Sequence, residues 1–508
     1  MKVFEKAGKE PNKALIPGVN FATMAELVGR KKIYALWLLF PIVNIFIYVG
    51  LCVDLARSFG RLDLKDSALA VIYAPAIFYS IGKNKEDKYY GPVLAQEKAY
   101  YASIEEAREA GNERELRKLE HKNPYTKSQP REWVEAIVFA VFAAAFIRMF
   151  LIEAYTIPTT SMEGSLLAGD FLFVSKAHYG IRTPKTVAMV PLLHNMLPVI
   201  GSESYLTSPN LPFYRLPAIE EIDPMDPVVF NYPEGDSVYV TPGRTWSVYD
   251  LRREPRIEQN YKATRYGLRV RPIDKKDHYI KRCVGVPGDS IKIIDRQLYR
   301  NGSPAANPEH LQFRYKVTAP DGISQTKMDE WGVHFSPSES RWDGNQGFLF
   351  LDEETLNKIK AISPNITAEP MSYPNDNLFP HDKRINQGWT VDNFGPIWIP
   401  KKGATVKITP ETIAPYRRII HVYENNNLEI KGGKIYINGT ETDEYTFQQN
   451  YYWMMGDNRH NSEDSRVWGY VPFDHVVGKP LFIWFSTKNG SMSKGINWDR
   501  IFTSASQM

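Results

Sequence analysis

The sequence predicts a mainly β protein that is anchored in a membrane by helices near its N-terminus. Three observations lead to this prediction. Three apolar runs lie in the first third of the 508 residues. After residue 152, short runs of alternating polarity are separated by Gly, Pro, Asn and Asp, as in all-β domains. A chain of this length also exceeds one ordinary domain, so we expect two or more folded units.

The composition excludes several classes of protein. The 62 Lys and Arg residues nearly cancel the 58 Asp and Glu residues, which argues against a nucleic-acid-binding surface. The 33 glycines, 35 prolines and 29 tyrosines indicate turn-rich β structure rather than a helical bundle. Two cysteines are too few for a disulfide framework. The sequence contains no metal-ligand cluster, phosphate loop or dinucleotide fingerprint, so we expect no cofactor.

The first 152 residues divide by their polarity. Residues 1–32 form a polar segment, and residues 33–82 contain two apolar runs, 34–53 and 68–82, which predict a hairpin of two hydrophobic helices. The first run is long enough to span a membrane despite Pro41 and Asn44. The second is short for a span, so a buried or re-entrant hairpin remains an alternative. Residues 83–132 are a charged loop with a helix expected over 99–122, and residues 133–152 predict a transmembrane helix.

The distribution of basic residues predicts the orientation of these segments. Residues 1–32 contain seven Lys and Arg, residues 54–67 contain three, and residues 83–132 contain eleven. Basic segments stay on the cytoplasmic side. We therefore expect residues 1–32 and 83–132 inside, the connection around Arg57 outside, and everything after Ile152 outside. No cleavable signal peptide is visible, because the N-terminus is polar.

Residues 153–508 predict an exported, catalytic β domain with two insertions. Residues Ile291–Gly302 align without gaps to Leu428–Gly439, and each copy reads as strand, tight turn, strand. We interpret the two copies as related hairpins on either side of an insertion, 303–427. A second insertion covers 183–221. The aromatic run Leu481–Phe485 predicts a core strand, with a contact at the membrane interface as the alternative.

Two segments of this domain supply a nucleophile and a base. A serine hydroxyl needs an adjacent base to attack an amide, and a lysine serves as that base only if its pKa is lowered by desolvation. Ser161 lies in PTTSMEGSLLAGD, which begins at Pro158. Lys281 lies in YIKRCVGVPGD, which begins at Tyr279 and alternates like a strand. Ser161 and Lys281 are therefore the candidate nucleophile and base.

The two segments, with a third, resemble the bacterial type I signal peptidases, the leader peptidases that use a Ser/Lys dyad. The third is GDNRHNSEDSRVWG from Gly456, and a weaker box is Asp226–Phe230. The lysine motif matches throughout. The nucleophile motif, S-M-x-P-T-L in the family, departs at Gly164 and Ser165, and the third motif departs at His460, where the family has aspartate.

The resemblance implies a membrane-bound serine endopeptidase that removes signal peptides from exported preproteins. Ser161 takes the role of nucleophile, Lys281 of general base, Thr159 of oxyanion donor and Ser462 of the residue that orients the lysine. Asp464 and Arg466 match a structural ion pair, and Asp457, Asn458 and Arg459 support the site. The residues that correspond to shallow pockets for small substrate side chains are Tyr155, Ile157, Pro158, Met162, Leu166, Leu172, Tyr279 and Ile280.

The resemblance also implies a location and partners. The enzyme would be a multi-pass protein of the bacterial cytoplasmic membrane with its catalytic domain on the periplasmic side. Its partners would be preproteins that carry signal peptides, and membrane lipid. The oligomeric state stays open.

Other interpretations compete with this one. His460 could be a general base, although we expect it to replace a surface carboxylate. Cys283 could be a nucleophile, but no histidine motif accompanies it, and we expect a small buried residue. Ser491 to Lys494 fits the S-x-x-K of penicillin-binding proteins without the companion motifs. A membrane-anchored, non-catalytic β scaffold would leave the Ser and Lys segments unexplained.

Overall fold

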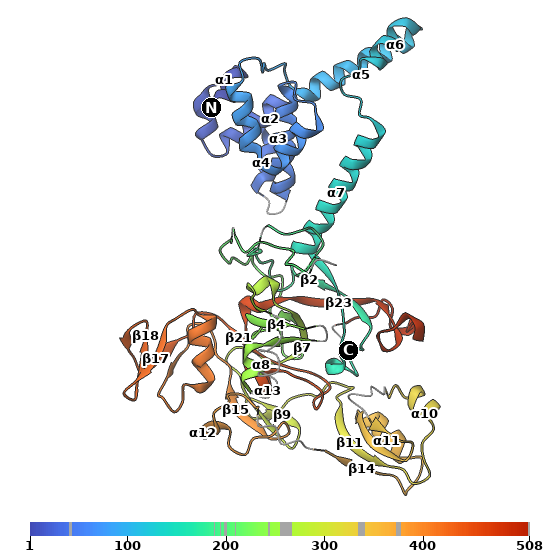
Figure 1. Ribbon diagram of the computed structural model, residues 1–508, viewed down its shortest axis with the longest axis vertical. Coiled ribbons are helices and arrows are strands. Elements are labelled where there is room, and N and C mark those ends of the chain that lie inside the picture. Colours follow the sequence, from blue (N-terminus) through green and yellow to red (C-terminus); the bar gives the residue numbers. More distant parts are fainter. Residues whose placement is uncertain are drawn as a thin grey trace. The chain divides into compact units, whose positions relative to one another are not determined.

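A computed structural model describes residues 1–39, 43–186, 188–193, 195–197, 201–208, 210–241, 244–253, 267–333, 341–371 and 377–505 (Figure 1). The chain divides into two units, Met1–Ala140 and Val141–Met508. Each unit is described by itself below.

The first unit is helical. Its elements are α1 (Lys2–Lys6), η1 (Pro11–Leu15), α2 (Val19–Val28), η2 (Lys32–Leu39), α3 (Val43–Ser58), α4 (Leu64–Lys83), α5 (Val93–Glu109), α6 (Glu113–His121) and the first part of α7 (Gln129–Phe150). One apolar core joins side chains from α1, α2, α3 and α4, among them Phe4, Leu27, Leu55 and Ile77. Residues 1–32 are thus part of the same folded unit as the two apolar runs.

Neither apolar run forms one straight helix. The first divides into η2 and α3, which pack against each other, and Pro41 between them lies outside the described residues. In the second, Tyr73 leaves the helical region inside α4, with φ −150° and ψ 75°. Pro75 follows it, and a proline lacks the N–H that a continuous helix would use.

The charged helix expected over 99–122 is two helices rather than one. A break at residues 110–112 separates α5 from α6, and the side chain of Asn112 accepts a hydrogen bond from the Glu115 N–H at the start of α6. Within the described residues, α4 and α7 are the two helices that are long and apolar enough to cross a membrane. None of the residues of α7 is buried.

The second unit is mainly β, as predicted. Its largest sheet has seven strands in the order β1-β2-β23-β3-β7-β21-β22, all antiparallel. The strands are β1 (Ile152–Thr156), β2 (Asp170–Ser175), β23 (Val476–Ser486), β3 (Pro227–Asn231), β7 (His278–Gly285), β21 (Tyr451–Met455) and β22 (Val471–Pro472). Figure 1 shows β23, near the end of the chain, beside β2. The sheet therefore joins segments that are far apart in the sequence.

The two predicted hairpins are confirmed. β8 (Ser290–Ile294) pairs with β9 (Gln297–Arg300), and β17 (Leu428–Lys431) pairs with β18 (Lys434–Ile437). Each turn has two residues with positive φ, Asp295-Arg296 and Gly432-Gly433, as tight hairpins require. Short third strands, β10 (Ser303–Pro304) and β19 (Thr440–Glu441), extend both.

The segment 303–427, predicted to be an insertion, contains a small αβ structure with its own core. Its sheet has the order β12-β13-β11-β14, built from β12 (Arg341–Trp342), β13 (Gln346–Leu351), β11 (Phe313–Thr318) and β14 (Thr367–Pro370), with α10 (Gln325–Glu330) and α11 (Glu353–Lys360). Beyond it, α12 (Lys383–Asn386) precedes β15 (Phe394–Trp398), which pairs with β8, and β16 (Thr405–Lys407) pairs with β20 (Glu444–Thr446). The described part of 183–221 is a ribbon of isolated bridges.

A further three-stranded sheet lies in the sequence between the weaker box, Asp226–Phe230, and β7, the strand that carries Lys281. It has the order β5-β4-β6, from β5 (Thr245–Ser247), β4 (Ser237–Val240) and β6 (Leu268–Val270), and α8 (Val248–Arg253) follows β5. These elements contribute one wall of the site described next.

Candidate active site

Ser161 lies in a tight turn directly after β1. The turn is a single 3-10 segment, Thr160–Met162, and Ser161 is 9% exposed. The third motif fixes this turn from the opposite end of the chain. The Asn458 N–H donates to the Ser161 carbonyl at 3.2 Å, and the Asn461 side-chain amide donates to Thr160 Oγ1 at 2.8 Å.

Lys281 lies on β7 and reaches the serine. Its Nζ is 2.7 Å from Ser161 Oγ and donates a 2.9 Å hydrogen bond to the Ile280 carbonyl. The side chain is almost fully buried, at 4% exposure. Burial lowers the pKa of Lys281 to about 8, and the carboxylates of Asp464, Glu463 and Asp457 oppose this shift only in part. The amine is therefore neutral in a useful fraction of molecules near neutral pH.

Two further predicted residues lie close to the pair. Thr159 Oγ1 is 3.4 Å from Ser161 Oγ. The Ser462 hydroxyl is buried and makes no hydrogen bond of good geometry within the described residues, although it helps to lower the pKa of Asp464. Ser462 lies close to Ser161 because residue 456 between them is glycine. A Cβ on residue 456 would lie 2.3 Å from Ser462 Oγ and 2.4 Å from the Ser161 carbonyl oxygen. The third motif and the serine turn can approach this closely because residue 456 has no side chain.

Two buried ion pairs support the lysine strand and the third motif. The Arg282 guanidinium contacts the Asp457 carboxylate at 2.6 Å, and the Arg466 guanidinium contacts Asp464 at 2.7 Å. Burial would raise the pKa of Asp464, but Arg466 outweighs it and the pKa is lowered. Burial, together with the nearby Arg466, lowers the pKa of Arg459 to about 10. Four of the five predicted supporting residues, Asp457, Arg459, Asp464 and Arg466, are thus buried charged groups.

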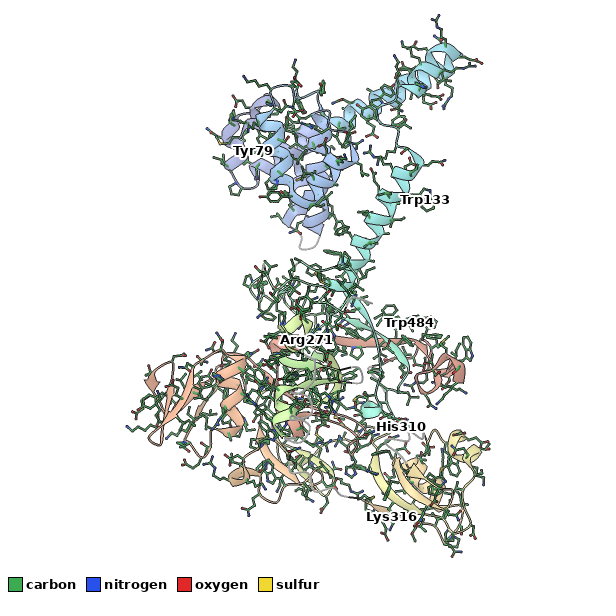
Figure 2. The ribbon with its side chains drawn as sticks, in the orientation of Figure 1. Tyr79, Trp133, Arg271, His310, Lys316 and Trp484 are labelled. Carbon is green, nitrogen blue, oxygen red and sulfur yellow. The ribbon has the colours of Figure 1, made fainter. Side chains whose placement is uncertain are left out.

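The departures from the family motifs have structural reasons. Gly164 has φ +97°, and a Cβ there would lie 2.2 Å from the carbonyl oxygen of His310, which Figure 2 labels. Proline, whose φ is fixed near −65°, cannot occupy this position. Ser165 Oγ accepts a 3.1 Å hydrogen bond from Arg282. The segment that contains His310 therefore packs against the serine segment at Gly164, where the family has proline.

His460 has a different role from the one we expected. Its side chain is 1% exposed, so it does not replace a surface carboxylate. The backbone N–H of Arg314 donates to Nδ1 at 3.2 Å, which leaves the proton on Nε2, and Nε2 donates to Asp392 Oδ1 at 2.7 Å. Both ring nitrogens are therefore engaged by the insertion. This arrangement does not fit a general base for Ser161.

The other competing residues are poorly placed for catalysis. Cys283 is fully buried, as expected, and burial raises the pKa of its thiol well above the ordinary value. Ser491 lies in a surface turn, where its hydroxyl is 2.8 Å from that of Ser493, and Lys494 is exposed to solvent. Neither Ser491 nor Lys494 lines the cleft described next.

A cleft of 640 Å³ opens over the Ser161–Lys281 pair. Seven of the eight predicted pocket residues line it: Tyr155, Ile157, Pro158, Met162, Leu172, Tyr279 and Ile280. Leu166 is the exception. It is 1% exposed and packs in the core beneath the cleft, against residues such as Ile157 and Leu172.

The sequence analysis missed the charged wall of the cleft. Arg244, Trp246, Asp250 and Arg253 come from the β5 and α8 region, and Glu463 comes from the third motif. The Arg244 guanidinium lies 2.7 Å from Glu463 and 4.1 Å from the Trp246 ring. Burial raises the pKa of Glu463. The segment 244–253 matches no motif, so the sequence gave no indication that it lines the cleft. Glu463 could have been expected near the cleft, because it lies within the third motif.

A buried serine–lysine pair in an open cleft of an antiparallel sheet is an arrangement that fits a serine hydrolase. Comparison with known families gives the class a name. The family described as signal peptidase, peptidase S26, matches residues 130–351 and 440–485. The chain belongs to this family and is a serine endopeptidase that removes signal peptides. A family of unknown function, DUF5684, matches residues 12–92.

Several curated relatives are similar over most of their length. Signal peptidase I of Helicobacter pylori strain J99 is 23% identical over 384 residues, which cover 73% of this chain and 90% of the relative. Signal peptidase I of Haemophilus influenzae is 25% identical over 379 residues, covering 74% and 76%. Signal peptidase I of Buchnera aphidicola is 23% identical over 385 residues, covering 74% and 84%.

Proposed function

We propose that Ser161 is the nucleophile and Lys281 the general base in the removal of signal peptides from exported preproteins. The observation that supports this most directly is the 2.7 Å contact between Ser161 Oγ and the buried Lys281 Nζ, whose pKa is lowered to about 8. Nucleophile and base must lie within hydrogen-bond reach, and the pKa of the base must be near the working pH.

The reaction then follows from these two groups. The neutral amine of Lys281 takes the proton from Ser161 Oγ as the oxygen attacks the scissile carbonyl carbon. The C–N bond breaks, Lys281 returns the proton to the leaving amine of the mature protein, and the signal peptide remains as an ester on Ser161. Water, deprotonated by Lys281, hydrolyses this ester and regenerates the serine.

Thr159 and the apolar part of the cleft complete the proposal. The Thr159 hydroxyl, beside Ser161 Oγ, is the side-chain donor for the oxyanion, and the backbone N–H of Ser161 is the second donor. One donor of this kind contributes about 2.7 to 4 kcal/mol to lowering the barrier. The apolar cleft residues, such as Ile157 and Leu172, accept small side chains at substrate positions −1 and −3. We keep Ser462 as the residue that orients the lysine.

The test is cleavage of a preprotein by purified variants. Ser161→Ala and Lys281→Ala should each abolish processing, and Lys281→Arg should not restore it, because guanidinium keeps its proton. Ser493→Ala, in the surface turn, is the matched control and should be fully active. Substantial cleavage by either alanine variant would refute the assignment.

We further propose that α7 spans the cytoplasmic membrane and that the catalytic unit lies on its periplasmic side. An aromatic surface supports contact with that membrane. β23 is an inner strand of the sheet, but within Leu481–Phe485, predicted to be a core strand, only Ile483 is buried. One face of β23 joins Phe171, Phe173 and Phe482 to the exposed Trp484, labelled in Figure 2. Nearby Phe502 is 77% exposed. Aromatic rings favour the membrane interface.

A chain that begins at Arg148 tests this placement. It keeps β1 and the ion pair between Arg148 and Glu153, whereas a start near Tyr155 would remove part of β1. Without the span, activity on short soluble peptides should persist. Activity on membrane-embedded preproteins should fall at least about tenfold, because tethering raises the effective concentration of the nucleophile. If the truncated chain retains the same fraction of the full chain's activity on soluble peptides and on membrane-embedded preproteins, the proposed role of the span is refuted.

A further inference from the structure

We propose that the N-terminal unit does not cross the membrane but inserts two re-entrant hairpins into one leaflet, with hydrocarbon as the occupant of its apolar face. The inference depends on the proposed placement of α7, and it assigns a lipid-binding surface to the segment matched by a family of unknown function. It also changes the predicted orientation, because it places both ends of each hairpin on the same side.

The first hairpin is η2 followed by α3. A single helix from residue 30 to residue 54 would separate its ends by about 36 Å. Instead, the Arg30 guanidinium lies 3.3 Å from the Asp54 carboxylate and 4.5 Å from the Tyr34 ring. The entry and exit of the first apolar run therefore lie together, and the run returns to the side from which it started.

The second hairpin is α4 itself. The Arg61 guanidinium lies 3.8 Å from Asp66, in the first turn of α4, and 2.8 Å from Asp87, four residues past its end. A straight helix of 20 residues would be about 30 Å long, too long for one guanidinium to contact carboxylates at both ends. The chain turns at Tyr73, where the backbone is not helical, and Pro75 reduces the number of N–H groups that the turn leaves unpaired.

The charged ends of both hairpins form one polar face. The Tyr90 N–H donates to the Ser58 carbonyl at 3.0 Å, and Arg57 lies 3.6 Å from Glu97 in α5. The connection around Arg57 therefore contacts the segment that follows α4. The sequence-based expectation placed these two segments on opposite sides of the membrane, which these contacts contradict. Basic-residue counting failed because it treated each apolar run as a crossing.

The same polar face meets the start of the span. The Arg131 guanidinium, in the first turn of α7, donates a 2.8 Å hydrogen bond to the Leu62 carbonyl. The entry point of α7 is thus level with the entry points of the hairpins. This continuity identifies lipid, rather than a second protein, as the occupant of the apolar face.

The dimensions of the second hairpin fit one leaflet. Tyr73 divides α4 into arms of 9 and 10 residues, about 14 to 15 Å each, which is half of a hydrocarbon core of about 30 Å. Large apolar side chains are exposed at the end of η2 and next to the break in α4: Leu39 is 76% exposed and Ile72 is 79% exposed. Exposed apolar side chains of this kind mark a surface that is covered in the working protein.

Thiol labelling of the full chain in spheroplasts tests the inference. The two native cysteines are buried, so the background is low. Single cysteines replace three exposed residues that form no ion pair in the described structure: Lys65→Cys before the turn of α4, Lys85→Cys after it, and Ser303→Cys in the catalytic unit. A membrane-impermeant maleimide is applied before and after permeabilisation. We expect residues 65 and 85 to be labelled only after permeabilisation, and residue 303 before it.

The outcomes separate this inference from the proposed orientation. Labelling at 65 but not at 85 before permeabilisation would show two full crossings and overturn the hairpins. Failure to label 65 in permeabilised membranes, with labelling after denaturation, would also overturn them. Labelling at both 65 and 85 in intact spheroplasts, or none at 303, would instead refute the orientation and leave the hairpins in place.

A second measurement identifies the occupant. A nitroxide attached through Ile72→Cys should be accessible to dissolved oxygen, which concentrates in hydrocarbon, and shielded from a water-soluble nickel chelate. The same label at Ser303→Cys should be accessible to the chelate. Low accessibility to both reagents at residue 72 would indicate protein packing, and access to the chelate would indicate water. Either result would refute insertion into lipid.

Discussion

The pH dependence of cleavage tests the proposed base most directly. Burial lowers the pKa of Lys281 from 10.5 to about 8. At pH 7 an ordinary lysine is neutral in about 0.03% of molecules, whereas a pKa near 8 leaves about 10% neutral, a gain of about 300-fold in active base. The value of kcat/KM should therefore rise about tenfold from pH 7 to a plateau above about pH 9.

The assay is peptide cleavage in detergent between pH 6 and pH 10, with His460→Ala as the comparison. A histidine base would give a rise near its reference pKa of about 6.5. His460→Ala removes the contact with Asp392 and lowers the amount of folded enzyme, but the position of the rise should not move. A rise near pH 6.5 in the native chain, or its loss in His460→Ala, would refute lysine as the base.

Two further predictions concern stability. Gly164→Ala places a Cβ 2.2 Å from the His310 carbonyl oxygen at φ +97° and should lower the free energy of unfolding by about 3 kcal/mol or more, whereas Gly439→Ala, with φ +84° and open space, should cost about 1 kcal/mol; equal losses in urea denaturation would contradict the packing argument. Lys281→Met removes the free-energy cost of burying a lysine whose pKa is lowered. This cost applies fully below pH 8 and disappears by pH 10.5, because between these pH values Lys281 binds a proton in the unfolded chain but not in the folded protein. The variant should be more stable at pH 7 by up to about 3 kcal/mol, with an advantage that shrinks as the pH rises to 10, and a pH-independent difference would contradict this linkage.

The proposed catalytic pair could be found in the sequence because each of its two motifs is local. Ser161 and Lys281 each lie in a short segment whose residues also form the local turn or strand, so the motif carries both the chemistry and the geometry. The two related hairpins, β8-β9 and β17-β18, were predictable for the same reason, because a two-residue turn fixes the pairing of its strands.

The features that escaped prediction depend on contacts between distant segments. Arg244 lies in the cleft because the β5-β4-β6 sheet brings it to Glu463, more than 200 residues away. His460 looked like a surface substitution because its partners, Asp392 and Arg314, lie in the insertion. Hydropathy gives the length of the first apolar run, but it does not reveal that the two ends of the run lie together, which the contact between Arg30 and Asp54 shows.

The hydrogen bonds that hold the serine turn have a consequence for the timing of activity. Asn458 and Asn461 contact residues about 300 positions earlier, and β23, which ends at Ser486, separates β2 from β3. A chain emerging from the ribosome presents Ser161 long before it presents these partners, and such non-local pairing forms slowly. The newly made enzyme therefore stays inert until nearly its whole chain has been synthesised and folded. Under the proposed periplasmic placement, its own translocation would also be nearly finished before it could cut any chain, including a neighbouring copy of itself.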